Sequence, residues 1–436
     1  MTNKFLLLGL FASLSVCAQD TSLSLREAVQ MAMTKSHPAK LADQKVSTAQ
    51  YSLQTTKMAQ YPDLKISGQY LRLTDADITM NRTGGESGEG SGSSPKADQL
   101  ILGQANASMP LFAGFKLRHS IASSENLYKA QIADTQSAKE DVAMAVIGHY
   151  AALYKSQKAI DLLRGSLKSS EQRVSDFTAQ EQNGLIARND LLKAKLQVSN
   201  IQLSLDAALK DEKQINYELI TLLQLPDRTH IVVSPDNVER DVIGSAVNDE
   251  NQAIAQRKDL QAAEYRQQAG SEQVKVAKGN YFPALSLVAG YAYVELGDVL
   301  RVENAMNFGV GLSYNLASLF KNRSEVKTAK SRVAEIEHQK AALTDQIKTQ
   351  LHNARETFAL AQKQHSVYEE AKAQADENFR IVKDKFDNGL ADTSDLLEAD
   401  VEDLSASINV AYSEAEIVLR YYQLLKAAGQ LYESFN

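Results

Sequence analysis

Two kinds of hydrophobic periodicity occur along this chain, one typical of helices and one typical of strands. Beyond Phe320, apolar or small residues recur every three or four positions, at Val326, Ala329, Val333, Ile336, Leu343, Ile347, Ala354, Phe358 and Ala361. This spacing is typical of the contact stripe of a coiled coil. Proline is absent between Pro110 and Pro226, and glycine is scarce there, so helix interiors are favoured. The pattern predicts long helices over residues 116–182 and 321–387, each about 100 Å long.

One short stretch appears twice at the ends of these predicted helices. NGLIARNDLLKA begins at Asn183, and NGLADTSDLLEA begins at Asn388, 205 residues later. An internal duplication is the simplest explanation of the match. Gly184 and Gly389 can adopt positive φ and end the outgoing helix. Each stretch is therefore predicted to be the tip of a helical hairpin.

The residues after each tip are expected to start a returning helix, which ends near Leu225 in one copy and near Gln430 in the other. Asp190 and Asp395 then fall in its first turn, where the helix dipole favours a negative charge. Glu398 follows Asp395 by three positions, so we also expect these two residues to form a capping box.

Four other segments alternate between apolar and polar residues with a period of two. They cover residues 62–74, 100–113, 283–296 and 305–317. In the first, Leu64, Ile66 and Tyr70 alternate with Lys65, Ser67 and Gln69. Alternation over about ten residues is typical of a strand in a membrane β-barrel, with one face in lipid and one in a lumen.

Four strands per chain are too few for a closed barrel, and an open sheet edge is not tolerated in lipid. Two chains would supply eight strands, but side chains fill the interior of a barrel that small. Three chains would supply twelve and leave a pore. The predicted fold is therefore mainly α with a membrane β-barrel. It has a long α-helical coiled-coil barrel plus four β-strands per chain, which close a 12-stranded barrel as a trimer.

The first residues indicate export from the cytoplasm. A lysine precedes an apolar run from Phe5 to Leu14, and small residues follow, so residues 1–18 read as a secretory signal peptide. Cleavage after Ala18 would remove Cys17, the only cysteine; lipidation of Cys17 is the alternative.

The duplication also divides the mature chain into segments. The expected ones are a first repeat at 19–226, a linker at 227–250 and a second repeat at 251–436. The first repeat carries an insertion between its two strands, NRTGGESGEGSGSSPK, which is rich in glycine and serine. A long flexible polar loop of this kind is typical of the outer mouth of a barrel.

Composition argues against several other classes of protein. The net charge is −7, with 54 acidic residues against 47 Lys and Arg, so no nucleic-acid partner is expected. One cysteine allows no internal disulfide, and the seven histidines show no paired metal-ligand spacing. The chain contains no G-x-S-x-G nucleophile elbow and no phosphate-binding loop. We therefore expect no enzymatic activity, no metal site and no cofactor.

The order of these segments resembles the TolC-like outer membrane efflux proteins over almost all of the mature chain. The resemblance rests on the opening SLREAVQMAMTKSHP, the pre-strand segments YPDLKISG and YFPALSLVAG, the strand-to-helix junction MPLFAGFKLR, and the two tips. It implies a homotrimeric exit channel of a tripartite efflux or type I secretion system, in contact with outer membrane lipid and extending into the periplasm. A periplasmic adaptor (membrane fusion) protein and an inner-membrane pump of RND or ABC type would be its partners, and its cargo would be drugs, metals or proteins.

The resemblance also implies roles for residues at the tips. Asp395 and Glu398 would line the periplasmic aperture, where rings of carboxylates favour cations. Asp190 and Phe386 match gating positions. Where the best-known member has an arginine, this chain has Ala391, so Arg188 is the candidate donor instead. The adaptor would dock on the tips, at Gly184, Leu185, Gly389 and Leu390.

Two other classes remain open on the sequence. The chain could be a periplasmic coiled-coil scaffold without a pore, although the alternating segments argue against this. It could also be a hydrolase acting through scattered acidic residues, for which no sequence motif selects a site.

Overall fold

The computed structural model describes residues 20–77, 96–233 and 250–435. The expected signal segment with Cys17 lies outside these ranges, as do the glycine- and serine-rich insertion up to Pro95 and most of the expected linker. The chain divides into two compact units. One consists of Met1–Gln44, Ala133–Gln261 and Leu343–Asn436, and the other of Lys45–Ile132 and Ala262–Ala342.

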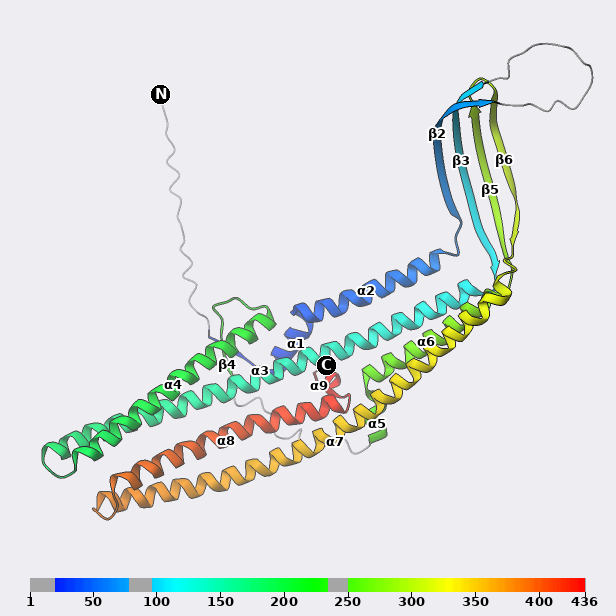
Figure 1. Ribbon diagram of the computed structural model, residues 1–436. Helices are drawn as coiled ribbons and strands as arrows, with labels where there is room; N and C mark the ends of the chain where they lie inside the picture. The colour runs from blue at the N-terminus through cyan, green and yellow to red at the C-terminus, as the bar shows by residue number, and fades with distance from the viewer. Residues whose placement is uncertain (1–19, 78–95, 234–249, 436) are drawn as a thin grey trace, which may run out of the picture. The chain divides into compact units, whose positions relative to one another are not determined.

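The second unit is built on an antiparallel four-stranded sheet in the order β2-β3-β5-β6. The strands, seen together in Figure 1, are β2 (Asp63–Asp77), β3 (Lys96–Ala113), β5 (Ala284–Leu296) and β6 (Leu300–Ser313). All four overlap the alternating segments of the sequence. Strand β6 lies earlier than its expected range, because the backbone turns after Ser313 and Ser318 N–H donates to the carbonyl of Asn315 (3.0 Å).

The strand register places apolar residues from all four strands on one face. Ile66 pairs with Ala105, Ala105 with Tyr291, and Tyr291 with Met306. Ile66 is 87% exposed and Phe308 on the same face is 92% exposed, so this apolar face is uncovered in the single chain. The opposite face carries the polar row Lys65, Asn106, Gly290 and Asn307. The sheet therefore has the two-sided character that the period-two pattern predicts.

The first unit contains two helical hairpins. They are α3 (Lys116–Gln182) with α4 (Arg188–Leu223), and α7 (Ser318–Asp387) with α8 (Thr393–Ala427); α3 and α7 also supply residues to the other unit. Figure 1 shows each pair running side by side to a tight turn. The long helices of the predicted fold are confirmed.

The remaining helices are shorter: α1 (Leu25–Lys35), α2 (His37–Met58), α5 (Glu250–Gln256), α6 (Lys258–Gly279) and α9 (Leu431–Phe435). The main core of the first unit brings α1, α9 and the ends of α4 and α8 against the middle of α3, with Val29, Ile147, Leu219, Leu424 and Leu431 buried there. No helix among the described residues has both the length and the apolar composition needed to cross a bilayer.

A small parallel sheet in the first unit has no signal in the sequence pattern. Strand β1 (Asp20–Leu23) pairs with β4 (His230–Val233), which falls in the stretch expected as a linker. Side-chain amides satisfy the free edge of β4. Gln157 Nε2 donates to the carbonyl of Ile231 (2.8 Å), and Asn216 Oδ1 accepts from the Ile231 N–H (2.9 Å). Strands of four residues are too short to show a hydrophobic period, and the side chains that stabilise β4 are distant in the sequence.

Candidate functional site: the hairpin tips

The two hairpin turns have the same backbone geometry. Gly184 and Gly389 have φ of +73° and +72°, the left-handed conformation that ends a helix. The following N–H closes a six-residue turn: Leu185 donates to the carbonyl of Gln180 (2.9 Å), and Leu390 to that of Lys385 (2.8 Å). The prediction that these glycines close the outgoing helices is confirmed.

The asparagine before each glycine also has the same role in both turns. Asn183 Nδ2 donates to the carbonyl of Ala179 and Asn388 Nδ2 to that of Asp384, both at 2.7 Å. The leucine after each glycine points away from the hairpin, since Leu185 is 73% exposed and Leu390 is 77% exposed. The repeated Asn-Gly-Leu therefore builds one turn twice and presents one exposed apolar side chain at each tip.

The returning helices begin differently. Asp392 is the N-cap of α8, and its carboxylate accepts from the Asp395 N–H (3.0 Å). Asp395 completes the capping box by accepting from the Asp392 N–H (3.3 Å). The expected box between Asp395 and Glu398 is therefore wrong, because α8 starts three residues earlier than that pairing requires. Both residues are exposed in this chain.

An aromatic core joins the two tips. The rings of Phe177 on α3 and Phe386 on α7 lie 5.6 Å apart, and Phe177 is 2% exposed. Leu191, Ala194 and Leu396 complete this buried cluster. Phe386, a predicted gating residue, thus packs against its own chain.

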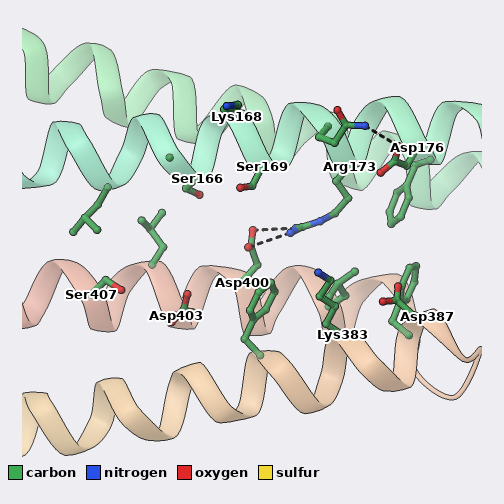
Figure 2. A pocket seen from close by; sticks show the side chains of 18 of the residues that line it. Ser166, Lys168, Ser169, Arg173, Asp176, Lys383, Asp387, Asp400, Asp403 and Ser407 are labelled. Atoms are coloured by element: carbon green, nitrogen blue, oxygen red, sulfur yellow. Dashed lines mark hydrogen bonds and ion pairs between the residues drawn. The ribbon is translucent and has the colours of Figure 1, made fainter.

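A charged clamp crosses between the hairpins behind this core. Arg173 on α3 donates to both carboxylate oxygens of Asp400 on α8, at 3.0 and 3.1 Å (Figure 2). Gln197 on α4 donates to the same carboxylate at 3.0 Å. The Arg173 and Asp400 side chains are only 14% and 13% exposed. A bidentate pair shielded from water is the strong and geometrically specific form of ion pair.

The clamp lies in a groove of about 870 Å³ between α3 and the second hairpin. Figure 2 shows Ser166, Lys168 and Ser169 on one side and Asp403 and Ser407 on the other. The charged residues that line the groove are Asp161, Lys168, Arg173, Asp176, Lys383, Asp387, Asp400 and Asp403. Carboxylates outnumber cations, so the groove is acidic apart from the clamp.

A second connection reaches the tip of α8. Lys193 Nζ on α4 donates to Ser394 Oγ at 2.8 Å and lies 3.6 Å from Asp190 Oδ1. Asp190, predicted as a gating contact, is thereby placed beside the cation that joins the two hairpins. Arg188, the candidate donor, is the first residue of α4 and is exposed.

Within the second hairpin, Lys372 on α7 forms an ion pair with Asp376 and lies 3.4 Å from Asp403 on α8. Burial, together with the neighbouring carboxyl group of Asp376, raises the pKa of Asp403. In the part of the chain that the structure describes, no three histidine, cysteine or acidic side chains converge as a metal site.

No sequence motif marks Arg173, Gln197, Lys193 or Asp400, although these residues connect the hairpins. One signal was available. Lys195 and Asp400 occupy equivalent positions at the 205-residue offset, and so do Lys193 and Glu398. Charge reversal between duplicated helices indicates that the two copies face different surroundings.

Comparisons with known proteins agree with this architecture. The family model "Outer membrane efflux protein" matches residues 28–224 and 250–432. The outer membrane efflux protein BepC of Brucella suis is 21% identical over 345 residues, which cover 78% of this chain and 75% of that protein. The multidrug resistance outer membrane protein MdtP of Escherichia coli is 22% identical over 429 residues, covering 93% and 84%.

Among solved structures, the Campylobacter jejuni CmeC outer membrane channel matches with a TM-score of 0.76 at 17% identity, covering 96% of this chain and 91% of that one. This likeness establishes the fold. The family match spans both repeats, including both tips. The chain belongs to the outer membrane efflux protein family, whose members are transport channels of the cell outer membrane.

Proposed function

We propose that the protein is the exit channel of a tripartite efflux or type I secretion system, a passive trimeric conduit gated at its periplasmic tip. The observation that carries this proposal is the sheet. Its apolar face is exposed, and among the described residues its outer strands β2 and β6 each pair on one side only. In a bilayer, unpaired backbone groups at such edges cost several kcal/mol each. Pairing β6 of one copy with β2 of the next removes them.

Closure with three copies gives a barrel wide enough to leave a lumen, whereas two copies give eight strands and a filled interior. The polar row that contains Lys65 and Asn106 would then face the lumen. A periplasmic scaffold without a pore, the alternative reading, would leave the exposed face around Ile66 and Phe308 in water.

Exposed apolar stripes on the helices support assembly of the same copies. On α4 the stripe consists of Leu192, Leu196 and Leu203, and on α7 of Leu360, Val367 and Ile381. The spacings are four and seven residues on α4, and one and two heptads on α7, as in coiled-coil contacts. We infer that the α4 stripe of one subunit packs on the α7 stripe of the next, which continues the lumen as a helical tube.

The aperture would be formed by α8 tips, with Asp395 and Glu398 directed to the lumen. Both are exposed in the single chain, so neither is committed to a buried contact. Three copies of each carboxylate would make a cation-preferring constriction that binds divalent ions. The capping role of Asp395 is compatible with this. The hydrogen bond from the Asp392 N–H uses one carboxylate oxygen, and the side chain is still exposed.

The closed state would be held by links between the hairpins. Asp190, Arg188 and Phe386 are the gating residues carried over from the sequence. The Arg173–Asp400 clamp and the Lys193–Ser394 hydrogen bond support a lock that does not need an arginine at position 391. Opening would require the second hairpin to move away from the first, which separates Arg173 from Asp400.

The adaptor would dock on the tips, and the pump would reach the channel through it. Gly184 and Gly389 shape the two turns, and Leu185 and Leu390 are the exposed apolar side chains that a partner helix could bury. A paired apolar contact at equivalent places on both hairpins suits a partner that meets all six tips of a trimer.

Planar-bilayer recording tests the aperture. The wild-type protein is expected to run as a heat-modifiable trimer and to give small cation-preferring channels. Replacing Asp395→Ala with Glu398→Ala should reduce cation preference and weaken block by divalent ions. The matched control is Asp206→Ala with Asp211→Ala, two exposed acids of α4, which should leave both unchanged. Wild-type selectivity in the first double variant would remove these carboxylates from the constriction.

A further inference from the structure

A cavity of about 440 Å³ lies where β3 passes into α3 in the second unit. Its walls are mostly apolar and include Leu111, Phe112, Phe115 and Ile121, while Lys116 and Arg118 also line it. An apolar cavity that carries cationic groups matches an amphiphile with an anionic head. Nothing in the channel function described above uses it.

The apolar part of this site continues the exposed face of the sheet. Leu111, near the end of β3, is 52% exposed, and Phe115, two residues beyond the strand, is 56% exposed. The site therefore sits at the border where the membrane-facing surface ends and the charged helical surface begins.

The backbone holds Phe115 outward at a conformational cost. Phe115 has φ of +60°, which is unfavourable for a side chain with a Cβ, and Gly114 before it has φ of +62°. A Cβ on Gly114 would lie 2.3 Å from the carbonyl oxygen of Gly279, so only glycine fits against the end of α6 in this turn. The turned ring meets Phe112 edge to face, with 5.2 Å between centroids. Uncommon backbone conformations of this kind concentrate at ligand sites.

The two cations of the cavity, Lys116 and Arg118, differ in their hydrogen bonding. Lys116 Nζ donates to Asn280 Oδ1 at 3.1 Å, which fixes it at one side of the cavity. Arg118 is exposed and makes no hydrogen bond or ion pair with any residue that the structure describes. A guanidinium presents paired donors that fit phosphate oxygens and is weakly hydrated, so it suits a headgroup at a membrane border.

The same residue order recurs in the second repeat. Phe320, Lys321 and Arg323 stand 205 positions after Phe115, Lys116 and Arg118, and Phe320 is 85% exposed. An aromatic anchor followed by cations at the first and third positions is thus present at both strand-to-helix junctions. In a trimer it would form a ring of six around the base of the barrel.

We propose that the cavity beside Arg118 binds an anionic glycerophospholipid of the bilayer, with the phosphate on Arg118 and an acyl chain along Leu111 and Phe115. This rests on the proposed function only in placing the base of the barrel at the inner leaflet. Continuity with the lipid-facing surface selects a membrane lipid as the occupant, and the charge of Arg118 selects an anionic one.

The test uses the full-length trimer in detergent and follows its thermal unfolding midpoint as lipid is added. Phosphatidylglycerol should raise the midpoint at lower concentration than phosphatidylcholine does, and inorganic phosphate should have no effect. Arg118→Gln should raise the half-maximal phosphatidylglycerol concentration about fivefold, the usual weight of one cation at a lipid surface. The matched control is Arg164→Gln, an exposed arginine further along α3, which should change nothing.

Equal responses to both lipids in the wild type, or an unchanged response in Arg118→Gln, would overturn the proposal. A response to phosphate alone would assign the site to the free ion instead and would also overturn it. If Arg118→Gln does not assemble, Arg118→Lys keeps the charge without the paired donors and should weaken the lipid preference by about twofold. Channel recordings separate the two hypotheses, because Arg118→Gln should conduct like the wild type even when its lipid preference is lost.

Discussion

The two hairpin tips share a similar sequence and close with the same turn, yet their returning helices are chemically different. Asn, Gly and Leu have the same hydrogen bonds, φ and exposure in both turns. Helix α8 then starts with a capping box at Asp392, whereas Ala187 at the start of α4 makes no side-chain cap. The turn that both hairpins use is the same, whereas the N-terminal caps of the two returning helices differ.

The divergence is mainly one of charge. Lys193 and Lys195 of the first hairpin stand where the second has Glu398 and Asp400. One consequence is visible in the structure, since Asp400 reaches across to Arg173. The two hairpins thus share one turn, and the acid found only in the second allows a specific ion pair between them.

Substitution in the Arg173–Asp400 clamp should have the largest effect on the difference between the two hairpins. Asp400→Ala leaves the largely shielded Arg173 without a counter-charge, a change that costs up to about 3 kcal/mol, the lower end for fully buried pairs. We expect a lower thermal midpoint of the trimer and larger, more frequent openings in planar bilayers. The control is Lys195→Ala at the equivalent exposed position of the first hairpin, which should behave like the wild type. Equal effects of the two substitutions would contradict a clamp specific to Asp400.

A buried acid distinguishes the outgoing helices in a similar way. Glu140 on α3 is 4% exposed and one of its carboxylate oxygens lacks a partner among the described residues, while Asp345 at the equivalent place on α7 is exposed. Burial raises the pKa of Glu140 from 4.5 to about 7; Asp259 adds to this, and Arg257 and Lys426 oppose it. The folded protein therefore holds a proton that the unfolded chain releases near pH 4.5.

Binding of this proton stabilises the folded state. Its contribution to the free energy of unfolding is fully present below pH 4.5 and is lost as the pH rises through 7. The contribution is about 3 kcal/mol per subunit. Glu140→Gln should reduce the loss of stability between pH 5 and pH 8, measured by chemical unfolding at both values. Asp345→Asn should not alter that difference. A pH dependence in Glu140→Gln as steep as that of the wild type would show that the carboxyl group does not titrate in this range.

The tip glycines should show the smallest effect and no asymmetry. Gly184→Ala and Gly389→Ala each force a Cβ into positive φ, at a cost of about 1 kcal/mol. In neither position would the added Cβ meet an atom within 4 Å, so the cost is conformational alone and equal. Hydrogen exchange at Leu185 and Leu390 measures each turn separately. Unequal effects would reveal a contact at one tip that the single chain lacks, such as a neighbouring subunit.

Much of the fold follows from local pattern. Long helices at 116–182 and from 321 onward, the four strands and the positive φ of both glycines depend on periodicity and backbone preference, which neighbouring residues express. The starts of the helices are harder to predict. The sequence allows a capping box either between Asp392 and Asp395 or between Asp395 and Glu398, and the two choices differ by about one helical turn. The structure has the first. Strands β1 and β4 are not predictable from local sequence. Backbone groups of β4 bond the side chains of Gln157 and Asn216, which lie on other elements.

By itself the sequence determined the duplication, the two periods and the residues that close each tip, because these depend on intervals along the chain. Only the tertiary structure decided which charges meet. Arg173 and Asp400 are 227 residues apart, and their pairing depends on the crossing of two hairpins whose relative rotation no local period encodes. The same holds for Glu140 and Arg118, since burial and the lack of a partner are properties of the packed surroundings.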